Sequence, residues 1–472
     1  MANVIIPTIK AQVVKTGVNR PFGTAGTIAI VGNFQKGDAN TPYFFGNPTD
    51  ALNAMGNSVS YSGSNVINYA FMQDLDNNNY GATDCVCVRA GATARATYQV
   101  LGAAAAQSIL LTADTGGVWA NGAANGLTVT IATGTVSGLK LTVMLNGVIL
   151  NNYDNCASAT DMMNKVNADS MCPISASGTT AQLAVMPVAV VAANFAGGTE
   201  TTPSTSDITT ALNTIAIENF DILILTDTVV NTYLPTLKAY LDTKFAIAKG
   251  SIGIFSLAEA TGVAATLTTV GTTDSDLMAY LYQQFICNGY TLTEAETAAR
   301  YASFVAGMPV NESPTNKIIT DIDGLNTLYN FGSTDTGYPL VDGGVTMFKL
   351  LNRQNQQYGI VSAITAIRDV DTTGQKVITS ELYATRIRNF AINYFNLTTW
   401  LGSVGIDNSI ESILGELENR VEDLISQNIL DDAIITMTPD PLNGQQAYAD
   451  VELIIPGIIK SIVIRVSLVG GD

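Results

Sequence analysis

The chain has 472 residues, which is too long for a single hydrophobic core and indicates about three domains. Its 22 Lys and Arg against 40 Asp and Glu give a net charge of −18, which argues against direct nucleic-acid binding and against docking on anionic lipid. The absence of histidine excludes Ser-His-Asp and Cys-His catalysis and removes the commonest ligand of zinc and copper. Charged residues make up only 13% of the chain, which leaves surface that other chains can bury.

The five cysteines are odd in number and scattered, so they do not form a disulfide framework and indicate folding in a reducing compartment. Cys85 and Cys87 alternate along residues 84–89, and we expect both in the core rather than on a metal ion. The most apolar stretch, residues 183–193, is interrupted by Pro187 and is too short to cross a membrane, and the first residues do not resemble a targeting segment.

Residues 1–22 form a predicted N-terminal arm, which ends at the turn residues of Arg20-Pro21-Phe22-Gly23. The arm is rich in residues that favour strands, but no hairpin partner follows closely. The arm residues expected to pair with another strand are Val4, Ile6, Ile9 and Val13.

Residues 23–94 and 201–340 are predicted to form a central α/β domain. Short apolar runs indicate buried strands, and apolar residues at every third or fourth position indicate helices. The expected strands are 27–31, 84–89, 220–225 and 251–255. The expected helices are 49–56, 64–73, one over Leu234 to Phe245, one after Asp274 bearing Leu277, Leu281 and Phe285, and one from a capping box at Thr293 and Glu296 to Gly307.

Residues 95–200 contain few charges and are predicted to form an inserted, β-rich outer domain. Residues 127–131 and 139–145 alternate between apolar and polar positions, which is typical of half-buried strands. Asn146-Gly147 then predicts a tight hairpin turn.

Residues 341–456 are predicted to form a C-terminal α+β domain, followed by an arm at 457–472. Its expected elements are strands near 345–350, 359–367 and 451–455, and helices near 380–401 and 408–427. The arm contains a strand, 461–468, with Ile462, Ile464, Val466 and Leu468 on one face. This strand belongs either to the chain's own sheet or to the sheet of a neighbouring subunit, and the β-prone segments at both ends of the chain favour the second interpretation.

Few motifs indicate chemistry. The chain has neither a phosphate-binding P-loop nor a G-x-S-x-G nucleophile turn. Two stretches, one beginning at Asp74 and Asp76 and one at Asp369 and Asp371, resemble calcium loops but lack the full ligand pattern, and we interpret both as turns. We therefore predict no catalytic residue, no metal site and no cofactor.

The last predicted helix carries a run of acidic residues. One interpretation is a solvated face with a single Glu416–Arg420 pair, and the other is a docking face for a basic partner. The residues of this face are Glu411, Glu418, Glu422 and Asp423.

Several motifs, taken in order along the chain, resemble those of contractile tail sheath proteins, as found in myovirus-type tails and related injection machines. A "VG…KG" turn ends at Lys36-Gly37, and a "GxW" motif begins at Gly117. A double glycine follows at Gly197-Gly198, and an "RxIR" helix contains Arg386 and Arg388. Helices at 50–56 and 298–309 match two further segments.

The resemblance implies a central domain of subtilisin-like topology without protease function, and terminal arms that donate strands to neighbouring copies. It also implies hexameric rings stacked around an inner tail tube, with baseplate and tail terminator proteins as further partners, assembled in the host cytoplasm into a virion tail or injection-system particle. The acidic helix then becomes a face for the tube. The alternatives are an α/β hydrolase-like or nucleotide-binding enzyme and a secreted surface-layer or adhesin protein.

Overall fold

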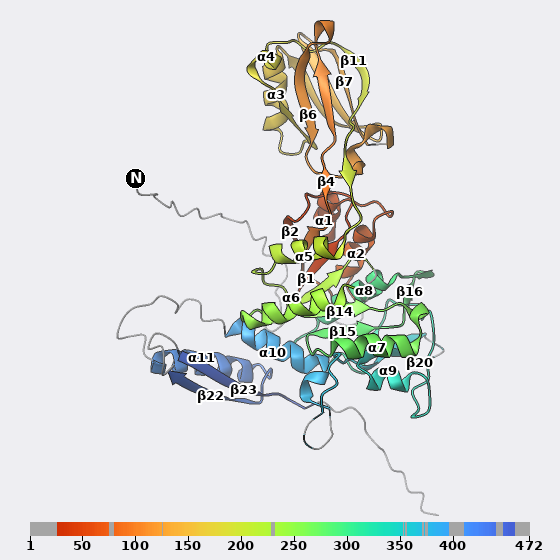
Figure 1. Ribbon diagram of the computed structural model, residues 1–472, viewed down its shortest axis with the longest axis vertical. Coiled ribbons are helices and arrows are strands. Elements are labelled where there is room, and N and C mark those ends of the chain that lie inside the picture. Colours follow the sequence, from red (N-terminus) through yellow and green to blue (C-terminus); the bar gives the residue numbers. More distant parts are fainter. Residues whose placement is uncertain are drawn as a thin grey trace, which may run out of the picture.

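The chain folds into a mixed α/β, multidomain structure, seen here in a computed structural model (Figure 1). The structure describes residues 26–74, 80–124, 126–227, 232–352, 354, 356–370, 372, 376–395, 410–439 and 447–457. Both predicted arms, apart from Gly457, lie outside these residues, and so do Asp76 and Asp371. Among the helices in the described part of the chain, none combines the length and apolar character that a bilayer crossing requires.

A nine-stranded sheet forms the centre of the molecule, in the order β18-β21-β20-β15-β14-β13-β1-β3-β2. Strands β3, β1, β13, β14, β15 and β20 run parallel, whereas β2, β21 and β18 pair antiparallel at the two sides. In chain order the strands are β1 Thr27–Gly32, β2 Pro42–Phe45, β3 Asp84–Arg89, β13 Ile222–Leu225, β14 Ile252–Ser256, β15 Met278–Leu281, β18 Ile318–Ile319, β20 Val345–Asn352 and β21 Gln357–Ser362.

Helices cover both faces of this sheet, which is why its parallel strands are apolar on both sides. Ile28 and Ile30 of β1 point into one core, together with Cys85 and Cys87, while Ala29 points into the other. Helices α1 Pro48–Met55, α2 Ser62–Ala70 and α8 Glu294–Gly307 cover the first face. Helices α5 Thr205–Thr214, α6 Leu234–Ala246, α7 Val263–Thr273 and α9 Tyr338–Asp342 cover the second.

The prediction of a helix after Asp274 is wrong. Helix α7 ends just before this residue, Asp274 adopts a left-handed conformation with φ 37°, and the chain continues as β15 and the short strand β16, Phe285–Cys287. All four residues of β15 are buried, so its apolar run belongs to the middle of a parallel sheet. The spacing of Leu277, Leu281 and Phe285 imitates a helix, because short apolar runs do not distinguish the two structures.

The central sheet also continues across the boundary predicted at residue 341. Val345 of β20 pairs with Tyr280 of β15, and β21 then pairs with β20. Besides α8, the crossover between β15 and β20 contains the five-residue helix α9 and four strands of two or three residues, which are β16, β17 Tyr290–Thr291, β18 and β19 Gly324–Leu325. Such short elements give little periodicity, so the sequence does not indicate that the sheet continues.

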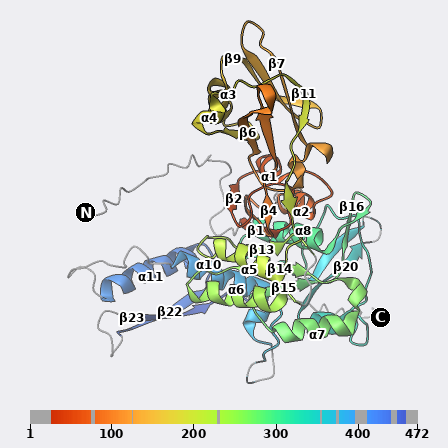
Figure 2. The same cartoon turned by 45° about the horizontal axis from the view of Figure 1, so that its top comes forward.

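The insertion stands at one end of the central domain and has a core of its own, built from residues between Ala96 and Phe195 (Figures 1 and 2). One sheet has the order β10-β6-β5 and the other β11-β7-β8-β9. The elements are β5 Thr97–Leu101, β6 Gln107–Ala113, β7 Leu127–Thr133, β8 Leu139–Leu145, β9 Val148–Cys156, α3 Ala159–Ala168, β10 Ile174–Ser177, α4 Thr180–Leu183 and β11 Val190–Asn194. Asn146 and Gly147 have φ of 51° and 75°, which confirms the tight turn between β8 and β9.

At another side of the central domain lies a group that we call the C-terminal unit, formed by α11 Ile410–Ser426, β22 Asp432–Pro439 and β23 Ala447–Ile454 (Figure 2). Helix α10, Leu382–Tyr394, lies between this unit and the central sheet. Leu424 of α11 packs with Ile387 and Ala391 of α10 in a small fourth core.

Candidate functional site

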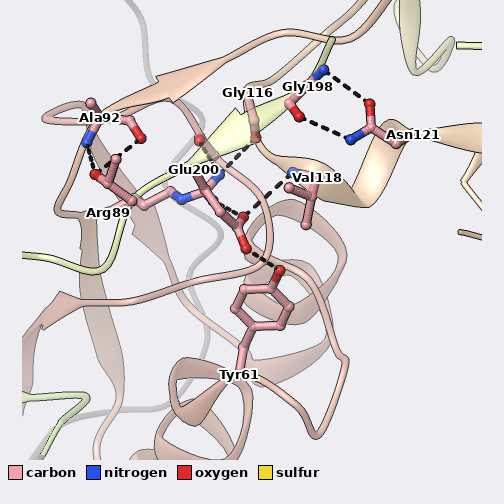
Figure 3. A network of polar contacts seen from close by, with 10 residues as sticks. Tyr61, Arg89, Ala92, Gly116, Val118, Asn121, Gly198 and Glu200 are labelled. Atoms are coloured by element: carbon pink, nitrogen blue, oxygen red, sulfur yellow. Dashed lines mark hydrogen bonds and ion pairs between the residues drawn. The ribbon is translucent and has the colours of Figure 1, made fainter. Parts of the chain in front are cut away.

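Three of the sequence motifs, far apart along the chain, meet where the insertion joins the central domain, a place that we call the joint (Figure 3). Here the chain enters the insertion through β4, Thr93–Ala94, and leaves it through β12, Thr199–Glu200, and these two strands pair antiparallel. The joint also contains a residue that no motif indicated, Arg89 at the end of β3.

Arg89 connects three parts of the chain through one guanidinium group, although its side chain is only 1% exposed. Nη1 donates hydrogen bonds to the carbonyl oxygens of Gly37, at 3.2 Å, and Gly116, at 2.6 Å. Nη2 donates to the Glu200 carboxylate at 2.7 Å. A loop of the central domain, the insertion and the strand that leaves it are therefore held by a single side chain.

The partner of Arg89 is itself fixed. Glu200 accepts hydrogen bonds from the Tyr61 hydroxyl at 2.5 Å and from the backbone N–H of Val118 at 3.4 Å. Burial lowers the pKa of Arg89, and the charge of Glu200 opposes that shift. Burial and the hydrogen bond to Glu200 raise the pKa of Tyr61 to about 12. The Tyr61 phenol is therefore neutral at physiological pH and serves as a second side-chain donor to Glu200.

The geometry of the joint explains the glycines of two motifs. Gly117 has φ +122°, and a Cβ there would lie 2.9 Å from Nη1 of Arg89. A Cβ at Gly198 would lie 2.3 Å from the carbonyl oxygen of Gly117. Asn121 exchanges two hydrogen bonds of 2.9 Å with the backbone of Gly198. Gly117 is needed because of its positive φ and the adjacent guanidinium of Arg89, and Gly198 is needed because its backbone lies against the carbonyl of Gly117.

The "RxIR" motif has a different role, which is to attach α10 to the central domain. Arg386 is buried and donates to the carbonyl of Met308 at 2.6 Å, at the end of α8. Arg388 forms an ion pair with Asp276, and its guanidinium carbon lies 4.6 Å from the centre of the Phe245 ring. The motif therefore fixes α10, which carries the C-terminal unit.

The acidic residues predicted on the last helix lie on the solvent-exposed side of α11. Glu411, Glu418, Glu422 and Asp423 are exposed, whereas the apolar face of α11 is buried. The predicted Glu416–Arg420 pair is confirmed, at 2.9 Å. Asp423 also accepts a hydrogen bond from the Tyr394 hydroxyl of α10 at 2.9 Å, so this carboxylate helps to attach the unit. The described residues of the C-terminal unit, including the segment to Gly457, carry nine carboxylates and one basic side chain.

Within the described residues, β22 and β23 pair only with each other, from Asp432 opposite Ile454 to Pro439 opposite Ala447. Helix α11 covers one face of this pair. On the other face Ile434 and Ile454 are 53% and 40% exposed. A sheet of two strands is marginal on its own, so additional strands paired to its outer edges would stabilise it.

The described part of the calcium-like stretches has structural contacts. Asp74 is fully buried, accepts two hydrogen bonds from Thr320, at 3.1 and 2.6 Å, and lies 3.7 Å from Arg300. No group of three or more metal-ligating side chains occurs among the residues that the structure describes.

No family model and no curated protein match this sequence. Solved structures do match. A sheath tail protein from Desulfitobacterium hafniense is 15% identical, with a TM-score of 0.66 over 96% of this chain and 100% of that one. A sheath tail protein from Listeria innocua is 14% identical, with a TM-score of 0.63 over 92% of this chain and 96% of that one. The sheath complex of an extracellular contractile injection system, in its contracted state, is 10% identical, with a TM-score of 0.53 over 99% and 98%.

These likenesses span the three parts of the chain, including the insertion, and they define a multidomain α/β fold with several sheets. This is the fold of contractile tail sheath proteins, and the resemblance seen in the sequence motifs is confirmed at that level.

Proposed function

We propose that the chain is a structural tail sheath subunit, which polymerises around an inner tube and contracts to drive that tube through a cell envelope. The observation that carries this proposal is the two-stranded sheet of the C-terminal unit, whose outer edges have no partner strand among the described residues. A chain with a sheet that is incomplete by itself is suited to polymerise by receiving strands from other copies.

The donors would be the two arms. Fully extended, residues 1–22 reach about 70 Å, which is far enough to cross to another subunit. One arm would pair through Val4, Ile6, Ile9 and Val13, and the other through Ile462, Ile464, Val466 and Leu468. Side chains of the added strands would also pack beside Ile434 and Ile454 on the same face of the sheet and reduce their exposure. Ladder hydrogen bonds and apolar burial together would offset the entropy of ordering each arm.

The remaining features follow from the fold likeness. We propose hexameric rings stacked along the tube, with the insertion at the outer radius and the acidic face of α11 directed at the tube. The proposed partners are other copies, the tube protein, and baseplate and terminator proteins, in a virion tail or injection-system particle assembled in the host cytoplasm. A sheath of this kind needs no enzymatic activity. The enzyme and surface-layer alternatives have no support from the matched structures, which are sheaths.

Truncation tests the strand donation. The full chain should form tubes with a helical surface lattice in negative-stain images, whereas a chain lacking residues 461–472 should stay a folded monomer. A chain lacking only residues 469–472 keeps the strand and serves as the matched control. Tubes formed by the longer truncation would rule out donation by the C-terminal arm, and slow hydrogen exchange at 462–468 in a verified monomer would place that strand in its own sheet.

A further inference from the structure

The insertion is connected to the central domain by only two chain segments, residues 90–96 and 197–203. These segments pair through the ladder of β4 and β12, which has two pairs, Ala94 with Thr199 and Thr93 with Glu200. Backbone hydrogen bonds from Thr201 to Ala92 and between Thr97 and Ala196 extend the ladder by one contact at each end. So short a ladder cannot by itself hold a domain of this size in one orientation, and separate cores joined by short segments are expected to move against each other. Further contacts across the joint therefore determine whether the insertion moves relative to the central domain.

We propose that the buried Arg89–Glu200 pair is a lock, which holds the insertion in one orientation so that it moves with the central domain as a single rigid body. Arg89 is suited to this role because its planar, forked guanidinium makes directional hydrogen bonds to three acceptors at once. The acceptors belong to different bodies: Gly37 to the central domain, Gly116 to the insertion, and Glu200 to the segment between them.

The groups that contact Arg89 are themselves held in position by further contacts. Glu200 is held from the central domain by the hydroxyl of Tyr61 and from the insertion by the N–H of Val118 (Figure 3). Gly117 fits closely beside the guanidinium, where a methyl group would collide with it. Rotation of the insertion would therefore separate a buried cation from its acceptors, which is strongly unfavourable.

A second ion pair crosses the same joint and provides a matched comparison. Arg95 of the insertion lies 2.5 Å from Asp38 of the central domain, but the two side chains are 42% and 36% exposed. Water and salt screen an exposed pair, so it contributes little to holding the two bodies together. The lock is also a property of the single chain and does not depend on assembly into a sheath.

The test uses the full chain with Arg89→Met, and Arg95→Met as control. Hydrogen exchange should become at least about tenfold faster at the joint amides of Gly117 and Gly198, whereas amides of β8 and β13 inside the two cores keep their protection. Small-angle scattering of Arg89→Met should show a broader distribution of intramolecular distances. Arg95→Met should match the original chain in both measurements, and Arg89→Lys should not restore the lock, because an ammonium group lacks the fork.

Two results would overturn the proposal. If the joint amides of Arg89→Met exchange as slowly as those of the original chain, the ion pair does not fix the orientation of the insertion. If amides throughout both cores lose protection, Arg89 is needed for folding rather than for orientation. Glu200→Gln removes only the charge of a partly exposed residue, and it should loosen the joint in the same sense but less strongly. If Arg89→Met does not fold, the Glu200→Gln variant tests the proposal instead. Hydrogen exchange at its joint amides that is as slow as in the original chain would then reject the lock.

Discussion

The insertion and the C-terminal unit are attached to the same central sheet in opposite ways. The insertion has a closed core, two sheets and a buried ion pair whose acceptors all lie within the same chain. The C-terminal unit is attached through α10 by a small core, and among the described residues its sheet has two strands. The contacts of the first attachment lie within one molecule, whereas the second presents a short sheet that, under the proposed function, strands of other copies would extend.

The two regions also differ in how they treat charge. At the joint, the guanidinium of Arg89 is buried and paired with the carboxylate of Glu200, whose side chain is 23% exposed. On α11, Glu418 and Glu422 face the solvent, and the unit has a large excess of carboxylates. Buried pairs fix geometry within a chain, whereas exposed charge of one sign steers the approach of an oppositely charged partner.

The largest effect on stability is expected from Leu424→Ala, because Leu424 is fully buried between α11 and α10. Removing the side chain should cost about 2–5 kcal/mol of unfolding free energy, as large-to-small changes in cores do. Exchange should accelerate over residues 411–426, measured by mass spectrometry, while the insertion stays protected. Ile425→Ala, at a half-buried neighbour, is the control, and equal deprotection of the insertion would show that the two regions are not independent.

Lys244 is a buried cation whose acceptors are backbone carbonyls, and it can be compared with Arg89, which has a carboxylate partner. Its ammonium group donates to the carbonyls of Ala216 and Glu218 and lies 4.2 Å from the centre of the Phe220 ring. Burial lowers the pKa of Lys244 from 10.5 to about 8. The unfolded chain therefore binds this proton more tightly, so the contribution of Lys244 to the unfolding free energy should rise with pH between about 8 and 10.5.

The measurement is the pH dependence of urea unfolding for the original chain and for Lys244→Met. The difference between the two should change by about 3 kcal/mol across that window, because one pKa unit corresponds to about 1.4 kcal/mol. Taking the difference removes the buried tyrosines, which titrate in the same range with the opposite sign. A difference that does not depend on pH would show that Lys244 is not perturbed by burial.

A smaller effect on the unfolding free energy is expected from replacing Gly117 of the joint with alanine. Gly117→Ala places a methyl group against Arg89 at a φ of +122°, and it should cost about 2–3 kcal/mol. Gly147→Ala, in the hairpin turn of the insertion, also has a positive φ, of +75°, but meets nothing within 4 Å. It should cost about 1–2 kcal/mol of backbone strain only. Equal losses in urea unfolding would mean that the close approach to Arg89 carries no energy.

The smallest effect on folding is expected from the double charge reversal Glu418→Lys and Glu422→Lys, because exposed substitutions of this kind change stability by about 0.5 kcal/mol or less. Binding should respond instead. Decoration of purified inner tubes should fall, and more so at low salt, while self-assembly without tubes is retained. The control is Asp450→Lys with Glu452→Lys, which changes the charge equally on another face of the unit. Unchanged decoration would remove α11 from the tube interface.

The regular parts of the fold could be predicted from local pattern. Buried strands such as β1 and β13, the capping box at Thr293 and Glu296, and the turn at Asn146-Gly147 have signals within a few residues. The order of helix and strand around Asp274 could not be predicted in this way, because the threonine-rich helix α7 has a weak apolar face and strand β15 is apolar throughout.

The joint could not be derived from the sequence because its partners are distant along the chain. Arg89 and Glu200 are 111 positions apart, and a charged residue at the end of a strand is ordinarily a surface residue. The glycine motifs at Gly117 and Gly197-Gly198 supported the family resemblance, but they did not indicate that these segments meet at Arg89. The arms lie outside the described residues, and strand donation, the tube face and the subtilisin-like topology of the central domain stay predictions.

The pairing of β4 with β12 has an evolutionary consequence. The chain leaves the central domain and comes back to it within one rung of a ladder, where opposite Cα atoms are about 5 Å apart. Any module whose own ends lie side by side can replace the insertion without stretching the remainder. The insertion can diversify, shrink or be exchanged by recombination while the central domain keeps its geometry. A foreign domain grafted at Ala94 and Thr199 would need to supply only an acceptor for the buried Arg89 in place of the Gly116 carbonyl.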